Sequence, residues 1–357
     1  MAKLNPDFRG ADEVEVPDNL AEKLGWYIPD VAENEEAYVE AEARKIEQLQ
    51  DDIPICFTAS ERTPVPPEMK EAWDKFQESK GRYPGSQDLS LMDEWVFGKP
   101  LLWEPQIIGS CVASNTFRPW VASYQYQCAF YSGEYLGGDE EGPNNIAFFA
   151  PYSYGCGRRR GNLRRGDGSF CGVQAESLMK DGVVRCDLPQ VRALYERYNV
   201  PYMGNNIPEP QGQAGIKFYR ALGEWSHLDD LKQYASNRLL ESPSVNSVEY
   251  LMELADMGYT AFVCSMEAIH KVGTHRDGFA IHARNPRDQW AHNMSFQGYF
   301  KASDGEVFIR ESNESWGAKH IYNRRQSEVD QAFRSGRLTV QAIGKIDTEK
   351  SQLQNAA

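Results

Sequence analysis

The sequence of 357 residues contains no apolar stretch of about 18 residues, the length that a membrane-spanning helix needs. Its first residues lack the apolar core of a secretory signal, so we expect a cytoplasmic protein with no membrane partner. Positive charge is also scarce. The 38 basic and 52 acidic side chains give a net charge of −14, which argues against nucleic acid as a partner.

Cysteine is present but not patterned. The seven cysteines are odd in number, scattered, and contain no C-x-x-C pair. This spacing fits reduced, mostly buried thiols better than a disulfide framework. Zinc sites usually bring two ligands within a few residues of each other, and no two of these cysteines are that close in the sequence.

Aromatic side chains are plentiful, at 12% of the residues, and predict a chain with a large core. Hydrophobic periodicity predicts a helix over residues 68–80 and, beyond residue 95, a mixture of helices and strands. In this second part we expect helices over 174–180, 188–198, 248–257 and 328–333, and strands over 259–264, 294–300, 307–310 and 338–343. Pro119 should kink or end a further helix over 112–130, because its ring removes a hydrogen bond and clashes with the preceding turn.

The N-terminal part differs in composition. Residues 1–50 carry 5 basic and 13 acidic side chains, a net charge of −8. Gly81–Ser90, which contains a Pro-Gly pair, is typical of a linker. We therefore interpret residues 1–95 as an acidic extension and residues 96–357 as the main domain. The extension could be an inhibitory pro-segment, an interaction region or a permanent cover.

Three short stretches contain side chains that can carry chemistry. Cys111 follows a Gly-Ser pair and can open a helix, whose positive end lowers the pKa of a thiol. His292 leads into a buried type of strand, and Asn313 lies shortly before a Ser-Trp-Gly sequence. Cysteine, then histidine, then a side-chain amide is the order that a thiol peptidase needs. The thiolate attacks a carbonyl, the imidazole transfers the proton, and the amide orients the ring.

In these three stretches the sequence resembles the papain-like cysteine peptidases, in particular their bacterial and phage-type branch. Gly109-Ser110-Cys111 is similar to the family's nucleophile motif. The segment 292–299, which begins with His292 and ends in Gly-Tyr, is similar to its histidine strand. Ser315-Trp316-Gly317 is similar to the end of its Asn-Ser-Trp-Gly motif. The resemblance implies an α+β papain-like fold, with a helical lobe, a β-sheet lobe and a cleft between them. It also implies that Gly168 and Ser169 help to bind substrate, and that no metal or organic cofactor is needed.

The sequence departs from the family at two catalytic positions. The family's oxyanion glutamine lies six residues before the nucleophile, whereas our candidate, Gln106, lies five before Cys111. The asparagine directly before Ser-Trp-Gly is replaced by Glu314. Either Asn313 reaches His292 through a one-residue bulge, or Glu314 holds the ring as a carboxylate, since both side chains accept a hydrogen bond from an imidazole N–H.

The nucleophile and the histidine are also unusually far apart, at 181 residues. We expect insertions in surface loops over 158–166 and 270–288 to absorb the excess. The first segment belongs to a run of five arginines between Arg158 and Arg165. Such a run can dock an acidic partner, but a solvated loop neutralised by the chain's own acidic N-terminal region is the simpler interpretation.

We therefore expect a cysteine peptidase that cleaves polypeptides through Cys111, His292 and Asn313 and an acyl-thioester intermediate. One alternative is a catalytically weak or inactive papain-fold protein with a structural or interaction role, for instance in a virus particle. The displaced amides and the acidic extension motivate it, because a fold can persist after its site has decayed. A second alternative is a peptidoglycan amide hydrolase. The expected partners are a polypeptide substrate and an assembly partner bound through residues 1–95.

Overall fold

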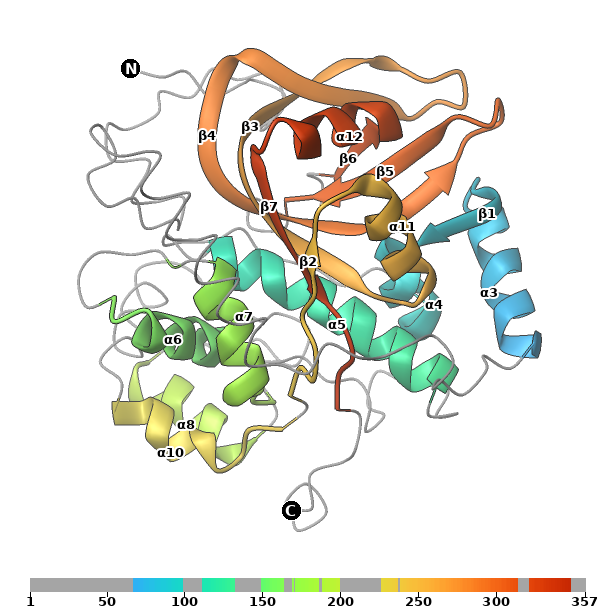
Figure 1. The fold of residues 1–357 in the computed structure, drawn as a ribbon. Helices are drawn as coiled ribbons and strands as arrows, with labels where there is room; N and C mark the ends of the chain where they lie inside the picture. Colours follow the sequence, from blue (N-terminus) through green and yellow to red (C-terminus); the bar gives the residue numbers. More distant parts are fainter. Residues whose placement is uncertain are drawn as a thin grey trace.

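The computed structural model describes residues 67–98, 111–131, 149–163, 169, 171–185, 188–199, 226–236, 238–313 and 321–347. These residues form helices packed against a seven-stranded sheet, which confirms the α+β class. The sheet lies on one side of the long helix α5 (Cys111–Tyr131), and α6, α7, α8 and α10 lie on the other (Figure 1). Within this part of the chain, every helix is too short or too polar to cross a bilayer.

The described part of the helical half contains four helices besides α5. They are α6 (Ala150–Arg160), α7 (Cys171–Lys180), α8 (Pro189–Arg197) and α10 (Ser226–Lys232). Helices α6 and α8 have a proline in the first turn, where the missing N–H would have no helical partner. Their apolar faces meet in a core that includes Tyr152, Val191 and Leu228. The helices expected over 174–180 and 188–198 are thus confirmed as α7 and α8.

The sheet half consists of strands in the order β2-β7-β3-β4-β5-β6. Their bounds are β2 (Ser244–Val245), β7 (Leu338–Ile343), β3 (Thr260–Thr274), β4 (Ala280–Lys301), β5 (Val307–Ser312) and β6 (Ile321–Arg325). Neighbours in this order are antiparallel, and His282 of β4 also pairs with Arg324 of β6. The long strand β4 therefore curls the sheet back on itself, as Figure 1 shows. The four expected strands are all confirmed, two of them much longer than expected.

Two helices cover the sheet. They are α11 (Val248–Asp256), which ends before Gly258 as expected, and α12 (Gln326–Arg334). Ser247 caps α11 by accepting a hydrogen bond from the backbone N–H of Tyr250 at 3.1 Å. The buried residues of α11 and Val329 of α12 share one apolar cluster with residues of β3 and β4.

Polar contacts hold α5 against the sheet. Ser123 and Thr260 share a hydroxyl hydrogen bond of 2.8 Å, and the Thr260 hydroxyl also donates to the carbonyl of Pro119 at 2.6 Å. The helix continues through Pro119 to Tyr131, so the expectation that it could end at the proline is wrong. Burial on nearly every side of α5 outweighs the single hydrogen bond that the proline ring removes.

The segment before α5 joins the same sheet. It contains α3 (Pro67–Ser79), β1 (Tyr83–Asp88), η4 (Leu89–Leu91) and α4 (Met92–Phe97), and β1 pairs with β4. The indole of Trp73 donates to the side chain of Gln87 at 2.9 Å and ties α3 to β1. The linker expected over 81–90 is therefore wrong. Pro84 is compatible with a strand here because β4 is the one partner of β1 among the described strands, so β1 lies at an edge, and because the first half of β1 is exposed.

Both expected loop insertions are also wrong in part. Residues 270–288 lie mainly in β3 and β4, whose ladder extends to the pair Thr274 and Ala280. The hydrophobic pattern misses this hairpin because much of it is exposed and its stability comes from backbone pairing. Arg158–Arg160 form the last turn of α6, and two of these arginines pair with nearby carboxylates. Arg160 pairs with Asp181 at 2.6 Å and Arg159 with Asp229 at 2.7 Å.

Substitution of Gly298 tests how closely β1 packs against β4. The φ of this glycine is +106°, and a Cβ at this position would lie 2.0 Å from the carbonyl oxygen of Gln87. Replacing it with Ala should lower the free energy of unfolding by roughly 2–5 kcal/mol, because backbone strain and a clash add. Gly305→Ala is the matched control, since Gly305 has a φ of +84° and open space around it. Urea unfolding of both variants checks this, and equal losses would contradict the close approach of β1.

Candidate active site

Cys111 is the first residue of α5 and is fully buried. Burial raises the pKa of its thiol from 9.0 to about 12, and backbone amides of Asn293, Val112 and Cys111 itself lower it by a smaller amount. The helix terminus lowers this pKa as expected, but burial outweighs the effect, because removing a thiolate from water costs more than the backbone dipoles return.

His292 and Asn313 contact each other directly. The distance between His292 Nε2 and Asn313 Oδ1 is 2.8 Å, and both residues are fully buried. The strand register explains the contact, since Ser295 of β4 pairs with Ser312 of β5 and Asn313 follows that pair. An amide oxygen can only accept, so Nε2 carries the proton of a neutral ring, and Nδ1 is the nitrogen that can accept a proton from another group.

Asn293 brings the cysteine helix and the histidine strand together. Its backbone amide faces the thiol of Cys111 and lowers the pKa of that thiol, and its carbonyl oxygen accepts from the Asn115 side chain at 2.5 Å. Cys111 and Asn115 are one helical turn apart and share a face of α5. Because Asn293 directly follows His292, the structure brings Cys111 next to the strand segment that carries the histidine.

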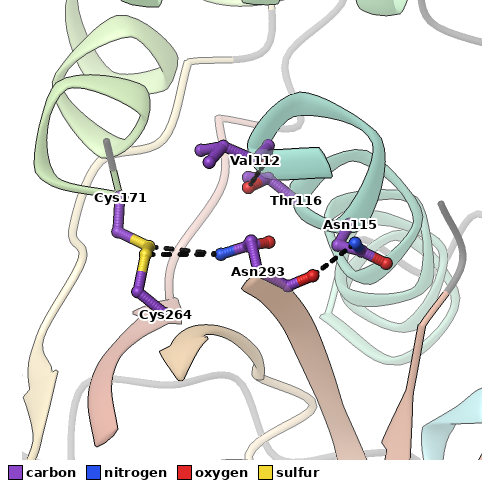
Figure 2. Close-up of a disulfide and its surroundings, with 6 residues drawn as sticks. All are labelled: Val112, Asn115, Thr116, Cys171, Cys264 and Asn293. Carbon is purple, nitrogen blue, oxygen red and sulfur yellow. Dashed lines mark hydrogen bonds between the residues drawn. A yellow bond between two sulfur atoms is a disulfide. The ribbon is translucent and has the colours of Figure 1, made fainter. Parts of the chain in front are cut away.

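A disulfide joins Cys171 and Cys264 beside this segment. Cys171 opens α7 in the helical half, and Cys264 lies in β3 of the sheet half. The side-chain amide of Asn293 donates to Cys171 Sγ at 3.2 Å and to Cys264 Sγ at 3.7 Å (Figure 2). The expectation of reduced thiols is therefore wrong for this pair. The two cysteines are 93 residues apart, and only the packing of α7 on β3 makes them neighbours.

Four further residues were expected to take part in catalysis or substrate binding. Gln106, Glu314 and Gly168 lie outside the described residues, so their expected roles stay predictions. Ser169 is fully buried, and a Cβ added to Gly157 of α6 would lie 3.4 Å from its hydroxyl oxygen. The structure therefore places Ser169 within the helical half, and its role in substrate binding also stays a prediction.

A buried charged cluster lies in the sheet half near Asn313. Arg324 contacts Glu267 at 2.8 Å and Glu311 at 3.1 Å, and it also pairs with Glu328. Burial raises the pKa of Glu311 from 4.5 to about 7, although the guanidinium of Arg324 lowers it. Burial likewise raises the pKa of the Tyr322 hydroxyl, and the side chain of Asn313 lowers it by a smaller amount.

One group of residues has the composition of a metal site. Ligand atoms of His275, Asp304 and Glu306 all lie within 4.8 Å of one another. Each already interacts with another side chain. His275 Nε2 is 3.1 Å from Asp304, Arg276 pairs with Asp304 at 3.4 Å, and Arg325 pairs with Glu306 at 2.7 Å. These contacts account for the cluster as a turn-stabilising network.

Sequence reasoning missed Asn115 and Asn293. The first could have been found from its position four residues after Cys111, because such residues share a helix face. The second is adjacent to His292, but its three contacts come from α5, α7 and β3, which are distant in the sequence. Nothing in the order of residues indicates that these elements meet at one side chain.

No protein-family model matches the chain, and no curated protein matches it. Similar solved structures include xylellain, a cysteine protease from Xylella fastidiosa, at 13% identity and a TM-score of 0.47, covering 91% of this chain and 97% of that one. A procathepsin B from Trypanosoma congolense has 14% identity and a TM-score of 0.44, covering 87% and 89%. The bromelain protease from Ananas comosus has 11% identity and a TM-score of 0.39, covering 72% and 98%. At such low identity, the function has to follow from the geometry of the site itself.

The raised pKa of Cys111 predicts a pH-dependent stability. The unfolded thiol ionises near 9.0 while the folded thiol keeps its proton up to about 12, so stability should fall as the pH rises from 9 toward 12. The loss is at most about 1.4 kcal/mol per pH unit for one thiol. Cys111→Ala should remove the part of this slope that the Cys111 thiol contributes. Anaerobic urea unfolding between pH 8.5 and about 10.5 measures it.

Cys156 provides an independent check, because burial also raises the pKa of its thiol from 9.0 to about 12. Cys156→Ala should flatten the same pH range by a similar amount. If the Cys111→Ala variant and the unchanged protein lose equal stability over this pH range, the Cys111 thiol is not buried and protonated in the folded protein.

Proposed function

We propose that the protein is a cysteine peptidase in which Cys111 is the nucleophile, His292 the base and Asn313 the residue that orients the ring. The single observation that carries this proposal is the fully buried His292–Asn313 hydrogen bond of 2.8 Å, on a strand whose next residue, Asn293, is hydrogen-bonded to Asn115 of the cysteine helix. The assignment to a bacterial or phage-type branch, and the substrate-binding roles of Gly168 and Ser169, remain part of this proposal.

The proposed mechanism uses the proton arrangement at His292. Asn313 keeps the proton on Nε2, so Nδ1 accepts the thiol proton as the sulfur of Cys111 attacks the substrate carbonyl. The imidazolium then protonates the leaving amine, and the acyl-thioester is hydrolysed by water that the same ring activates. Because the proton moves during the attack, the mechanism does not require a thiolate in the resting protein.

A second candidate function is favoured by the burial of Cys111. A fully buried thiol with a raised pKa is inert, which fits a papain-fold protein that serves as a structural or interaction module. In that case the acidic N-terminal region would be the partner-binding part. The two candidates differ in whether Cys111 can be reached by substrate.

Replacing Cys111 with Ala should abolish hydrolysis of a fluorescently labelled unfolded protein, and His292→Ala should slow it at least ~10²-fold, because each removes a reacting group. Cys128→Ala is the control, since Cys128 is another buried cysteine of α5. If the unchanged protein shows neither hydrolysis nor alkylation of Cys111 by iodoacetamide after reduction, the interaction module is the better description.

Asn313 is expected to act through His292. Asn313→Ala should lower kcat roughly 10²-fold with a smaller change in KM, because the ring loses its orientation. Asn313→Asp should recover part of the rate, since a carboxylate also accepts from Nε2. Asn323→Ala is a matched control on the neighbouring strand β6, where the amide contacts Arg310 and Ala280. An equal loss of rate in Asn323→Ala would indicate a general effect on the sheet.

A further inference from the structure

The disulfide lies at the junction of the two halves of the molecule, directly beside the candidate site. Cys171 is fully buried and Cys264 nearly so. In the antiparallel ladder, Cys264 pairs with Asn293, the residue after His292. The covalent bond therefore links α7 to the sheet at the same level of the strands as the proposed base.

Asn293 connects this disulfide to Cys111. Its side-chain amide donates to both sulfur atoms, at 3.2 and 3.7 Å. Its carbonyl accepts from Asn115 of α5 at 2.5 Å, and its backbone amide lowers the pKa of the Cys111 thiol one turn earlier on the same helix. Figure 2 shows Asn293 between the disulfide and the first turns of α5. One residue thus ties together α5, α7 and β3 beside the first turn of α5, where Cys111 lies.

We propose that the Cys171–Cys264 disulfide and Asn293 form a redox-sensitive lock that keeps Cys111 buried, and that reduction of the disulfide opens the site. The consequence for catalysis rests on the proposed function, whereas the exposure of Cys111 does not. In the oxidised protein, α7 and β3 are joined covalently, so they cannot separate to admit a polypeptide to the buried sulfur.

Reduction is a balanced two-electron exchange with a dithiol. A dithiol thiolate attacks one sulfur of the disulfide, the S–S bond breaks, and a mixed disulfide forms. The second thiol of the reductant then closes to a cyclic disulfide. The reductant is oxidised, and its two protons end on the sulfur atoms of Cys171 and Cys264. Two separate thiols need more room than a disulfide in a packed core, and Asn293 loses the sulfur pair that it contacts.

The test uses the full chain and measures alkylation of Cys111 by mass spectrometry of its peptide. Oxidised protein is compared with protein treated with dithiothreitol and desalted under nitrogen, each pulsed with iodoacetamide at pH 8. We expect linked peptides of Cys171 and Cys264 before treatment, and at least a tenfold faster alkylation of Cys111 after it. Absence of the linked peptides, or an unchanged rate, overturns the lock.

Variants separate this disulfide from other effects of the reductant. The double variant Cys171→Ser with Cys264→Ser should react at the fast rate without reductant and show no further response. Asn293→Ala should raise the rate severalfold in the oxidised protein, and Cys128→Ala should keep the normal response. A reductant response that persists in the double variant, or an unchanged rate in Asn293→Ala, overturns the proposal. If the double variant does not fold, a dithiothreitol titration decides, because alkylation must follow the loss of the linkage.

Hydrolysis measured in parallel distinguishes the two proposals. Faster alkylation of Cys111 after reduction without any hydrolysis supports the lock and overturns the peptidase function. Hydrolysis that is equal in oxidised and reduced protein supports the peptidase and overturns the lock.

Discussion

Three elements converge on the backbone and side chain of Asn293, and the arrangement of the candidate site depends on that convergence. Helix α5 contacts it through Cys111 and Asn115, and the disulfide between α7 and β3 contacts it through both sulfur atoms. Since Asn293 follows His292 on β4, these contacts set where the ring lies relative to the thiol. A buried amide has few alternative partners, so each contact restricts the others.

Burial dominates the electrostatics of this region. The thiol of Cys111 lies at a helix N-terminus, where partial positive charge favours a thiolate, yet desolvation raises its pKa to about 12. Glu311 behaves in the same way, with a pKa of about 7 although Arg324 is 3.1 Å away. A closed site of this kind keeps its nucleophile protonated. Exposure of the sulfur is thus the step that separates a peptidase from an inert relative of the same fold.

The residues of the candidate site could be found in the sequence, but their contacts could not. Short motifs identify Cys111 and His292, and Asn313 was preferred over Glu314 although the family places its amide one residue later. The structure brings Asn313 to His292 through the register of β4 and β5, which depends on backbone pairing and not on the motif. The disulfide escaped prediction for a similar reason, since its cysteines lie 93 residues apart.

Local patterns in the sequence determined the helices α3, α7, α8, α11 and α12 and parts of the strands β3, β4, β5 and β7, because apolar periodicity indicates which face is buried. They misjudged β1 and the outer half of the β3–β4 hairpin, where exposed residues pair through their backbones. The identity of the candidate nucleophile, base and amide was likewise a property of the sequence. Only the tertiary structure decided that the thiol is buried and that Asn293 meets a disulfide, because burial and long-range contacts arise when distant elements pack.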